Sequence, residues 1–373
     1  MKIVLHKKRD LMIILLVCII PFLWYKDGYV IAKGDYYPFI ITCEKFYDDF
    51  YLWTSNSLGN PYLRPAHLIY GFLWFFARSI GINIGLWQII LRSIYFVSAI
   101  SSMYYLTKII YPSNKLAAII AGIFYIFNFF FMSILLNVGM LWTYGFLPLI
   151  IALLVKVVSQ NENIYKYIFC FALVFSVAVS VSSMNVANVI LIIISIGAIL
   201  FYYTLLERKI RIKLLVRNLT LLSIITFLLN IWWIIPIFNY YLLSPSMTLR
   251  QEVNVALWSW THARASFLNL FWLNGRWGWR PEYVTYYYNY TTNPILLFLV
   301  FIPFLIATIA LLFRNRNQKL NSYCMLLILI FMFLAKGLHE PFSFVNLALY
   351  NLSLIHISEP TRPRLISYAV FCL

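Results

Sequence analysis

The sequence predicts an all-α integral membrane protein, a polytopic helical bundle with about nine spanning helices. Hydrophobic residues make up 63% of the chain and charged residues only 11%, and the mean hydropathy is +0.82. A water-soluble domain cannot bury so much apolar surface. Apolar runs of about 20 residues recur, the length that crosses ~30 Å of hydrocarbon. Helices are expected because backbone polar groups in lipid must be satisfied within their own segment.

The formal net charge of +17 has two interpretations, nucleic-acid binding or basic cytoplasmic loops. Basic residues collect in the cytoplasmic loops of multi-pass proteins, so no nucleic-acid partner is expected. The five cysteines show neither the spacing of a disulfide framework nor that of a zinc site.

The first expected span runs from about Leu11 to Tyr25 and follows a basic N-terminal stretch, residues 2–9. No small-residue cleavage site follows it, so we expect an uncleaved helix with a cytoplasmic N-terminus. The other eight expected spans are Gly85–Leu106, Leu116–Leu136, Met140–Val157, Tyr167–Ser183, Val186–Leu206, Leu219–Leu243, Ile295–Phe313 and Tyr323–Ala335.

The segment His67–Ile82, which contains Arg78 and several aromatic residues, decides the sidedness of the rest. If it spans the membrane, the basic stretches Glu207–Arg217 and Arg314–Lys319 fall outside the cell. If it lies in the interface, both become cytoplasmic, as the positive-inside rule requires. We therefore predict an interfacial helix over residues 67–82.

This topology leaves two long outer loops, residues 26–66 and 244–293, on the outer face of the cell membrane. It also places eight acidic residues outside, and five of them fall within residues 27–49. These eight are Asp27, Asp35, Glu44, Asp48, Asp49, Glu252, Glu282 and Glu340. The acids therefore concentrate in the first outer loop.

The tail, residues 352–373, does not fit the pattern and resembles the translation of a sequencing-library adapter. Such a scar is excluded from reasoning about the fold. We therefore expect residues 1–351 to form one polytopic membrane domain, truncated after Asn351, followed by a non-native tail.

In the first outer loop, Gly34 allows a tight turn before Asp35, and Pro38 fixes the backbone shortly after. This favours a functional carboxylate held at the membrane surface. Glu44, Asp48 and Asp49 have helical spacing, which fits either supporting acids or the solvated face of an amphipathic loop helix.

The stretches "GDYYPF" and "LWTSNSLGNP", placed between the first span and an interfacial helix, resemble the GT-C superfamily of polytopic glycosyltransferases. Within it they look most like the α-(1→3)-arabinofuranosyltransferase-like proteins. The resemblance implies transfer of a sugar from a polyprenyl-phosphate donor to a glycan or glycolipid acceptor on the outer face. It also implies that Asp35 is the general base, with Glu44, Asp48 or Asp49 assisting or binding a divalent cation.

The second outer loop carries Arg264, Arg276 and Arg280. Guanidinium groups suit the phosphate of a lipid-linked donor, so phosphate binding is one interpretation of these arginines. Trp277 and Trp279 fit either stacking on a sugar or ordinary interfacial anchoring.

Within the bilayer, Arg92 is either a functional cation or an arginine that snorkels to the outer surface. Asn185 and Asn188 lie near the proposed cavity, which makes Asn185 a further site candidate, and helix capping at an outward helix end is the favoured alternative. No His/Cys cluster indicates a zinc site. Whether the protein binds another metal ion stays open.

Two further function classes remain open beside the glycosyltransferase. One is a transporter or flippase of lipid-linked oligosaccharide, although such proteins usually place ionisable residues at mid-membrane. The other is a non-catalytic subunit of envelope assembly. The crowding of acids in one outer loop favours chemistry at the surface.

Overall fold

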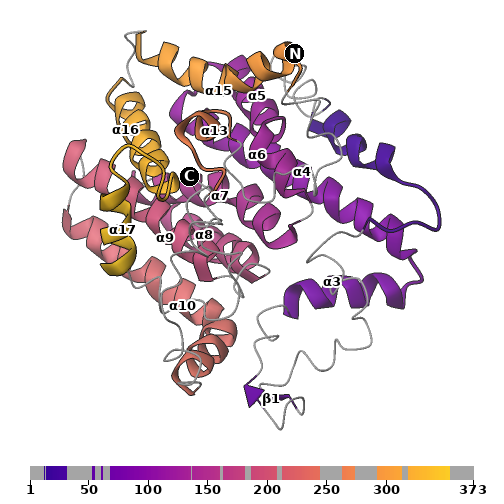
Figure 1. Cartoon of the computed structure of the whole chain (residues 1–373). Helices are drawn as coiled ribbons and strands as arrows, with labels where there is room; N and C mark the ends of the chain where they lie inside the picture. The colour runs from indigo at the N-terminus through magenta and orange to yellow at the C-terminus, as the bar shows by residue number, and fades with distance from the viewer. Residues whose placement is uncertain are drawn as a thin grey trace, which may run out of the picture. The chain divides into compact units, whose positions relative to one another are not determined.

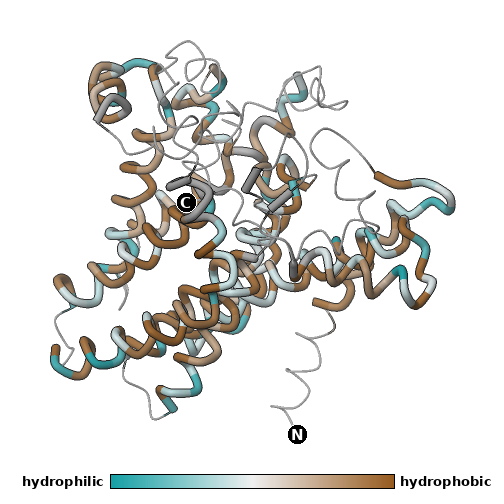
Figure 2. The backbone as a smooth tube through the Cα atoms, turned by 90° about the horizontal axis from the view of Figure 1, so that it is seen from below, coloured by the Kyte–Doolittle hydropathy of each residue, from teal (hydrophilic) through white to brown (hydrophobic). Residues whose placement is uncertain are grey.

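A computed structural model of the chain describes residues 12, 14–31, 53–54, 60–61, 68–135, 137–159, 163–180, 186–207, 212–243, 263–273, 292–312 and 318–352. Within these ranges the regular structure is helical, apart from the two-residue strands β1 (Trp53–Thr54) and β2 (Asn60–Pro61). Six helices of the described part are long and apolar enough to cross a membrane. The apolar colour follows these helices and the hydrophilic colour gathers near their ends (Figure 2). This is the architecture of a multi-pass α-helical membrane protein.

The six candidate spans cover Ile84–Ile110, Lys115–Ile134, Val138–Val158, Asn188–Leu206, Ile212–Pro236 and Gln318–Ala335. The other three expected spans also coincide with helices. Two of these, Ile14–Trp24 and Ile164–Val179, are shorter apolar helices, and the third is α15 (Pro294–Leu312). Nine crossings therefore stay a prediction, whereas each apolar segment is mainly helical in the residues that the structure describes.

The chain packs as two compact units that interleave in sequence. The first comprises Met1–Phe127, Ile134–Asn185 and Glu207–Leu243. It contains the 3₁₀-helix η1 (Ile20–Trp24) and the helices α3 (Leu68–Ser79), α4 (Ile84–Ile110), α5 (Lys115–Ile126), α7 (Val138–Val158), α8 (Ile164–Ser180) and α10 (Ile212–Leu243). Helix α4 packs against α5 and α7, α7 against α8, and α8 against α10 (Figure 1). Helix α7 is the most buried of the candidate spans.

Asparagine side chains fix where several helices of the first unit begin. Asn83 accepts hydrogen bonds from the backbone N–H groups of residues 85 and 86 at the start of α4. Asn114 and Asn137 do the same for the first turns of α5 and α7. Such caps satisfy backbone donors that have no partner within the helix, and each typically contributes ~1 kcal/mol.

Helices α4, α5 and α7 approach closely through small residues and reciprocal tyrosine contacts. The Ser102 hydroxyl donates to the carbonyl of Gly145 (2.6 Å). A Cβ on Gly145 would lie only 2.6 Å from the Ser98 hydroxyl, so a side chain there would require the Ser98 side chain to turn away. The rings of Tyr125 and Tyr144 stack with centroids 4.1 Å apart, and each hydroxyl donates to the other's backbone carbonyl.

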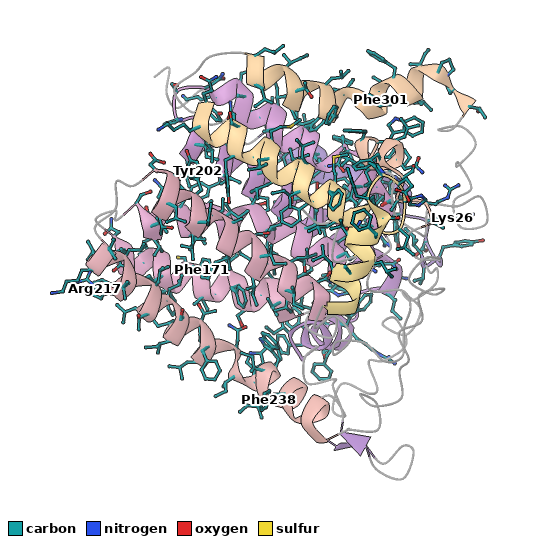
Figure 3. All side chains as sticks on the ribbon, turned by 60° about the vertical axis from the view of Figure 1, so that its left-hand side comes forward. Lys26, Phe171, Tyr202, Arg217, Phe238 and Phe301 are labelled. Atoms are coloured by element: carbon teal, nitrogen blue, oxygen red, sulfur yellow. The ribbon has the colours of Figure 1, made fainter. Side chains whose placement is uncertain are left out.

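The second unit comprises Asn128–Ser133, Val186–Leu206 and Ser244–Leu373. Its helices are α6 (Phe129–Ile134), α9 (Val186–Phe201) with the π-helical turn η7 (Tyr202–Leu206), α13 (Phe267–Phe271), α15, α16 (Gln318–Ala335) and α17 (Ser343–Leu352). Helix α16 packs against α13 and α15. The Tyr323 hydroxyl of α16 donates to the carbonyl of Ala198 in α9 (2.8 Å), and its ring lies 5.3 Å from that of Tyr202 (Figure 3).

Three local features differ from, or sharpen, what the sequence predicts. Helix α10 begins at Ile212 rather than Leu219, because Lys and Arg are good helix formers and continue the helix into the basic stretch. Helix α3 has 12 residues, about 18 Å in length, too short to cross the hydrocarbon. Its interfacial position stays a prediction.

The third difference is the antiparallel pair β1–β2, since the sequence predicts an all-α fold. Trp53 pairs with Pro61 and Thr54 with Asn60. Strand β2 contacts α10, and the pair lies beside the end of α10 beyond Phe238 (Figure 3). Arg217 marks the opposite end of that helix (Figure 3). Within this unit, the segment predicted to form the first outer loop therefore meets the end of α10 remote from its basic residues.

Candidate functional site

The segment predicted to form the first outer loop begins with a short structured stem, residues 25–31. The Tyr25 hydroxyl donates to the carboxylate of Asp27 (2.9 Å), and this bond raises the pKa of Tyr25. Gly28 has a φ of 74°, a left-handed conformation that glycine adopts without strain. The ammonium group of Lys26 lies 4.2 Å from the centre of the Tyr29 ring. These contacts turn the chain back toward α4 directly after the first helix.

Gln88 of α4 holds the last described residue of this stem. Its side-chain oxygen accepts from the backbone N–H of Ile31 (2.8 Å), and its side-chain N–H₂ donates to the Ile31 carbonyl (2.6 Å). Gln88 is only 1% exposed and Ile31 is half-buried, so both bonds are partly shielded from water. The side chain thus substitutes for a backbone partner on both polar groups of one residue.

Gly85 lets the stem approach α4 one turn earlier. A Cβ at this position would lie 2.5 Å from the backbone oxygen of Tyr29. Further along the helix, the Trp24 ring meets the edge of Phe96, with ring centroids 5.9 Å apart. The stem and the end of the first helix therefore lie along one stripe of α4.

Arg92 lies on this stripe. Residues 85, 88, 92 and 96 are separated by three or four positions, the spacing of one helix face. Arg92 is 2% exposed, and its terminal nitrogens are buried in the protein rather than extended to water. The structure thus places one predicted cation on the face of α4 that holds the stem of the first outer loop.

Arg264 lies in the described part of the segment predicted to form the second outer loop, just before α13. Its backbone carbonyl accepts from the Asn269 side chain (2.9 Å), and Ser266 caps the helix. Ala265 and Leu270 are buried against Ala335 at the end of α16. This packing fixes the backbone from which Arg264 extends.

A lysine directly after α16 is buried, and it is not among the site residues predicted from the sequence. Lys336 is 0% exposed, donates to the carbonyl of His339 (2.7 Å) and lies 4.7 Å from the Phe333 ring centre. Burial lowers the pKa of Lys336, and the charge of Glu340 opposes that shift. The available signal was the position of this lysine directly after the apolar run "LIFMFLA".

The turn after Lys336 is held by α17. The Asn346 side chain donates to the carbonyls of Phe333 (2.9 Å) and Gly337 (2.7 Å). The Ser343 hydroxyl donates to the Glu340 carboxylate (2.8 Å), which lowers the pKa of Glu340. This cluster supports the packing on which α13 rests.

Most of the predicted site residues lie outside the described residues: Asp35, Glu44, Asp48, Asp49, Asn185, Arg276, Trp277, Trp279 and Arg280. Asn188 is described and does not cap a helix end, because α9 begins at Val186 and Asn188 lies inside its first turn, 1% exposed. Arg92 belongs to the first unit, and Arg264 belongs to the second.

Within the described ranges, no group of three or more His, Cys, Asp or Glu side chains is arranged to hold a metal ion. The acids predicted to bind a cation, Glu44, Asp48 and Asp49, fall outside those ranges. A divalent cation therefore stays a prediction from the resemblance.

Comparison with models of protein families, with curated proteins and with solved structures finds no significant match to this chain.

Proposed function

We propose that this protein is a GT-C-type membrane glycosyltransferase acting at the outer face of the cell membrane. It moves a sugar, a pentofuranose by the resemblance, from a polyprenyl-phosphate donor to a glycan or glycolipid acceptor of the cell envelope. The observation that supports this most is the anchoring of Tyr29 and Ile31 on α4. Asp35 follows only four residues later, so its loop starts from a fixed point on a membrane helix.

Asp35 is the general base in this proposal. Its carboxylate takes the proton of the acceptor hydroxyl, whose oxygen forms a bond to the anomeric carbon of the sugar. The bond from that carbon to the phosphate oxygen breaks, and polyprenyl phosphate leaves with the electron pair. The configuration at the anomeric carbon inverts, so a single carboxylate acting as the base is enough for the reaction.

Cationic side chains stabilise the phosphate as it leaves. Arg264, Arg276 and Arg280 are the candidates on the second outer loop, and Arg92 is the candidate on α4. Trp277 and Trp279 stack on the sugar. Glu44, Asp48 and Asp49 assist Asp35 or hold a divalent cation through their oxygens.

The arrangement of the first unit supports an outer-face site. Strand β2 of the first outer loop contacts α10 near Phe238, at the end opposite Arg217 (Figure 3). Basic helix ends favour the cytoplasm, which supports an outer position for the loop with Asp35.

Reconstitution in liposomes tests the function itself. The purified protein receives a labelled polyprenyl-phosphate pentofuranose, or the matching hexose lipid, together with a glycan acceptor. Formation of a labelled glycan supports the glycosyltransferase. Movement of the donor between leaflets without a product indicates a flippase. The absence of both product and donor movement indicates an assembly subunit. Either of these two outcomes contradicts the proposal.

A further inference from the structure

We propose that Gln88 is a positioning residue that fixes Ile31, the residue from which the loop carrying Asp35 continues, on α4. The inference rests on the proposed function, since it concerns how the general base is presented to its substrate. It is supported by the two hydrogen bonds between the Gln88 side chain and Ile31 (2.8 and 2.6 Å).

The geometry of the contact is specific to a carboxamide. One side chain satisfies both the N–H and the C=O of Ile31, and at neutral pH a carboxamide offers the donor and the acceptor side by side on one planar group. The two residues are 57 positions apart in sequence, so local structure does not bring them together. A buried polar group without its partner costs ~1–3 kcal/mol, so the pair holds its place once formed.

The contact also has the position that a support for catalysis needs. Ile31 is four residues before Asp35, and four extended residues reach at most ~14 Å. A stem released from α4 moves the start of that short tether. Displacements of about 1 Å at a reacting group lower rates by ~10²-fold.

The first variant is Gln88→Met, which keeps the length of the side chain and removes both bonds. We expect kcat to fall ~10²-fold with the KM for the donor nearly unchanged. In an Asp35→Asn background the same substitution has no further effect, because Gln88 acts through Asp35. Equal losses in both backgrounds, or wild-type transfer by Gln88→Met, overturn the proposal.

The second variant, Gln88→Glu, tests the contact within one folded protein. When ionised, the introduced carboxylate accepts from the Ile31 N–H but opposes the Ile31 carbonyl, whereas the protonated carboxyl restores both bonds. Burial at this position raises the pKa of the introduced carboxyl, so the switch occurs closer to neutral pH. The ratio of variant to wild-type rates therefore rises as pH falls, and a flat ratio contradicts the proposal.

Ser102→Ala is the matched control, because Ser102 is a buried residue of the same helix whose hydroxyl bonds Gly145 instead. This variant lowers the melting temperature but does not show the loss of kcat expected for Gln88→Met.

Hydrogen exchange separates this inference from the proposed function. In Gln88→Met the amide of Ile31 loses protection, whether or not the protein transfers sugar. Unchanged protection sinks the positioning role even if transfer is found. If Gln88→Met loses protection at Ile31 but the wild type shows no sugar transfer, the proposed function is contradicted and the contact itself is established.

Discussion

The backbone carbonyl of Tyr29 lies against the Cα of Gly85, so that a methyl group added to Gly85 would be 2.5 Å from the carbonyl oxygen. No real Cβ tolerates so short a distance to a backbone atom. The stem of the first outer loop therefore contacts the first turn of α4 only because residue 85 has no side chain.

Gly85→Ala is expected to push the stem off α4. The oxygen in its way belongs to the backbone, so the loop must shift rather than a side chain turn. We predict a lower melting temperature and a transfer rate reduced ~10-fold or more. Gly197→Ala is the control, because a Cβ there meets nothing within 4 Å and alanine favours a helix. Equal behaviour of the two variants would contradict the contact.

Arg92 is predicted to serve function beyond stability. Removing one member of a buried charged interaction destabilises a fold, so Arg92→Met should lower the melting temperature. We expect this variant also to lose transfer on the order of 10²-fold, with Arg92→Lys recovering part of the rate. The exposed Arg78 of α3 gives the control Arg78→Met. If Arg92→Met transfers normally, the cation has no part in the reaction.

The reciprocal pair Tyr125–Tyr144 is predicted to join α5 to α7. Removing either hydroxyl leaves one backbone carbonyl without its donor, which costs ~1 kcal/mol of unfolding free energy. A double-mutant cycle with Tyr125→Phe and Tyr144→Phe should give non-additive losses, measured by unfolding in mild detergent. Tyr165→Phe, at an exposed position, serves as the reference. Strictly additive losses would show that the two bonds form independently.

Lys336 predicts a dependence of stability on alkaline pH. Burial lowers its pKa in the folded protein, so the folded state releases the proton at a lower pH than the unfolded chain does. Between these two pKa values the unfolded state holds more protons, and the unfolding free energy rises with pH. We expect the melting temperature of the wild type, measured relative to that of Lys336→Met, to fall as pH drops from ~10 to neutral.

Lys319→Met supplies the comparison for this pH series, because Lys319 is exposed. Its curve should run parallel to that of the wild type, whereas Lys336→Met should be flatter. A wild type whose melting temperature falls with pH in the same way as Lys336→Met would refute the buried-lysine account.

The helices were predictable because the membrane imposes a simple requirement on sequence. Each expected apolar segment coincides with a helix, since a stretch of about 20 apolar residues is stable in lipid only in that form. Boundaries were less predictable: α10 starts at Ile212 within a basic stretch. Charged residues occur both in loops and in the end turns of helices, so the sequence alone does not locate such a boundary. The packing of the helix decides it.

The site contacts were not predictable because they join residues far apart in sequence. Nothing in "GLWQIILRS" indicates that Gln88 receives the backbone of Ile31. The β1–β2 pair and the burial of Lys336 likewise depend on partners contributed by other elements. Arg92 was identified from its cost in lipid, but its place beside the loop stem follows only from the fold.

The most direct test of the account compares the wild type with Asp35→Asn and Asp35→Ala for sugar transfer from a labelled polyprenyl-phosphate donor in proteoliposomes. Both variants lack a base and should lose ~10²–10⁴-fold in kcat with donor KM retained. Glu252→Gln, in the other outer loop, should transfer normally. Transfer at the wild-type rate by both Asp35 variants would contradict the central claim.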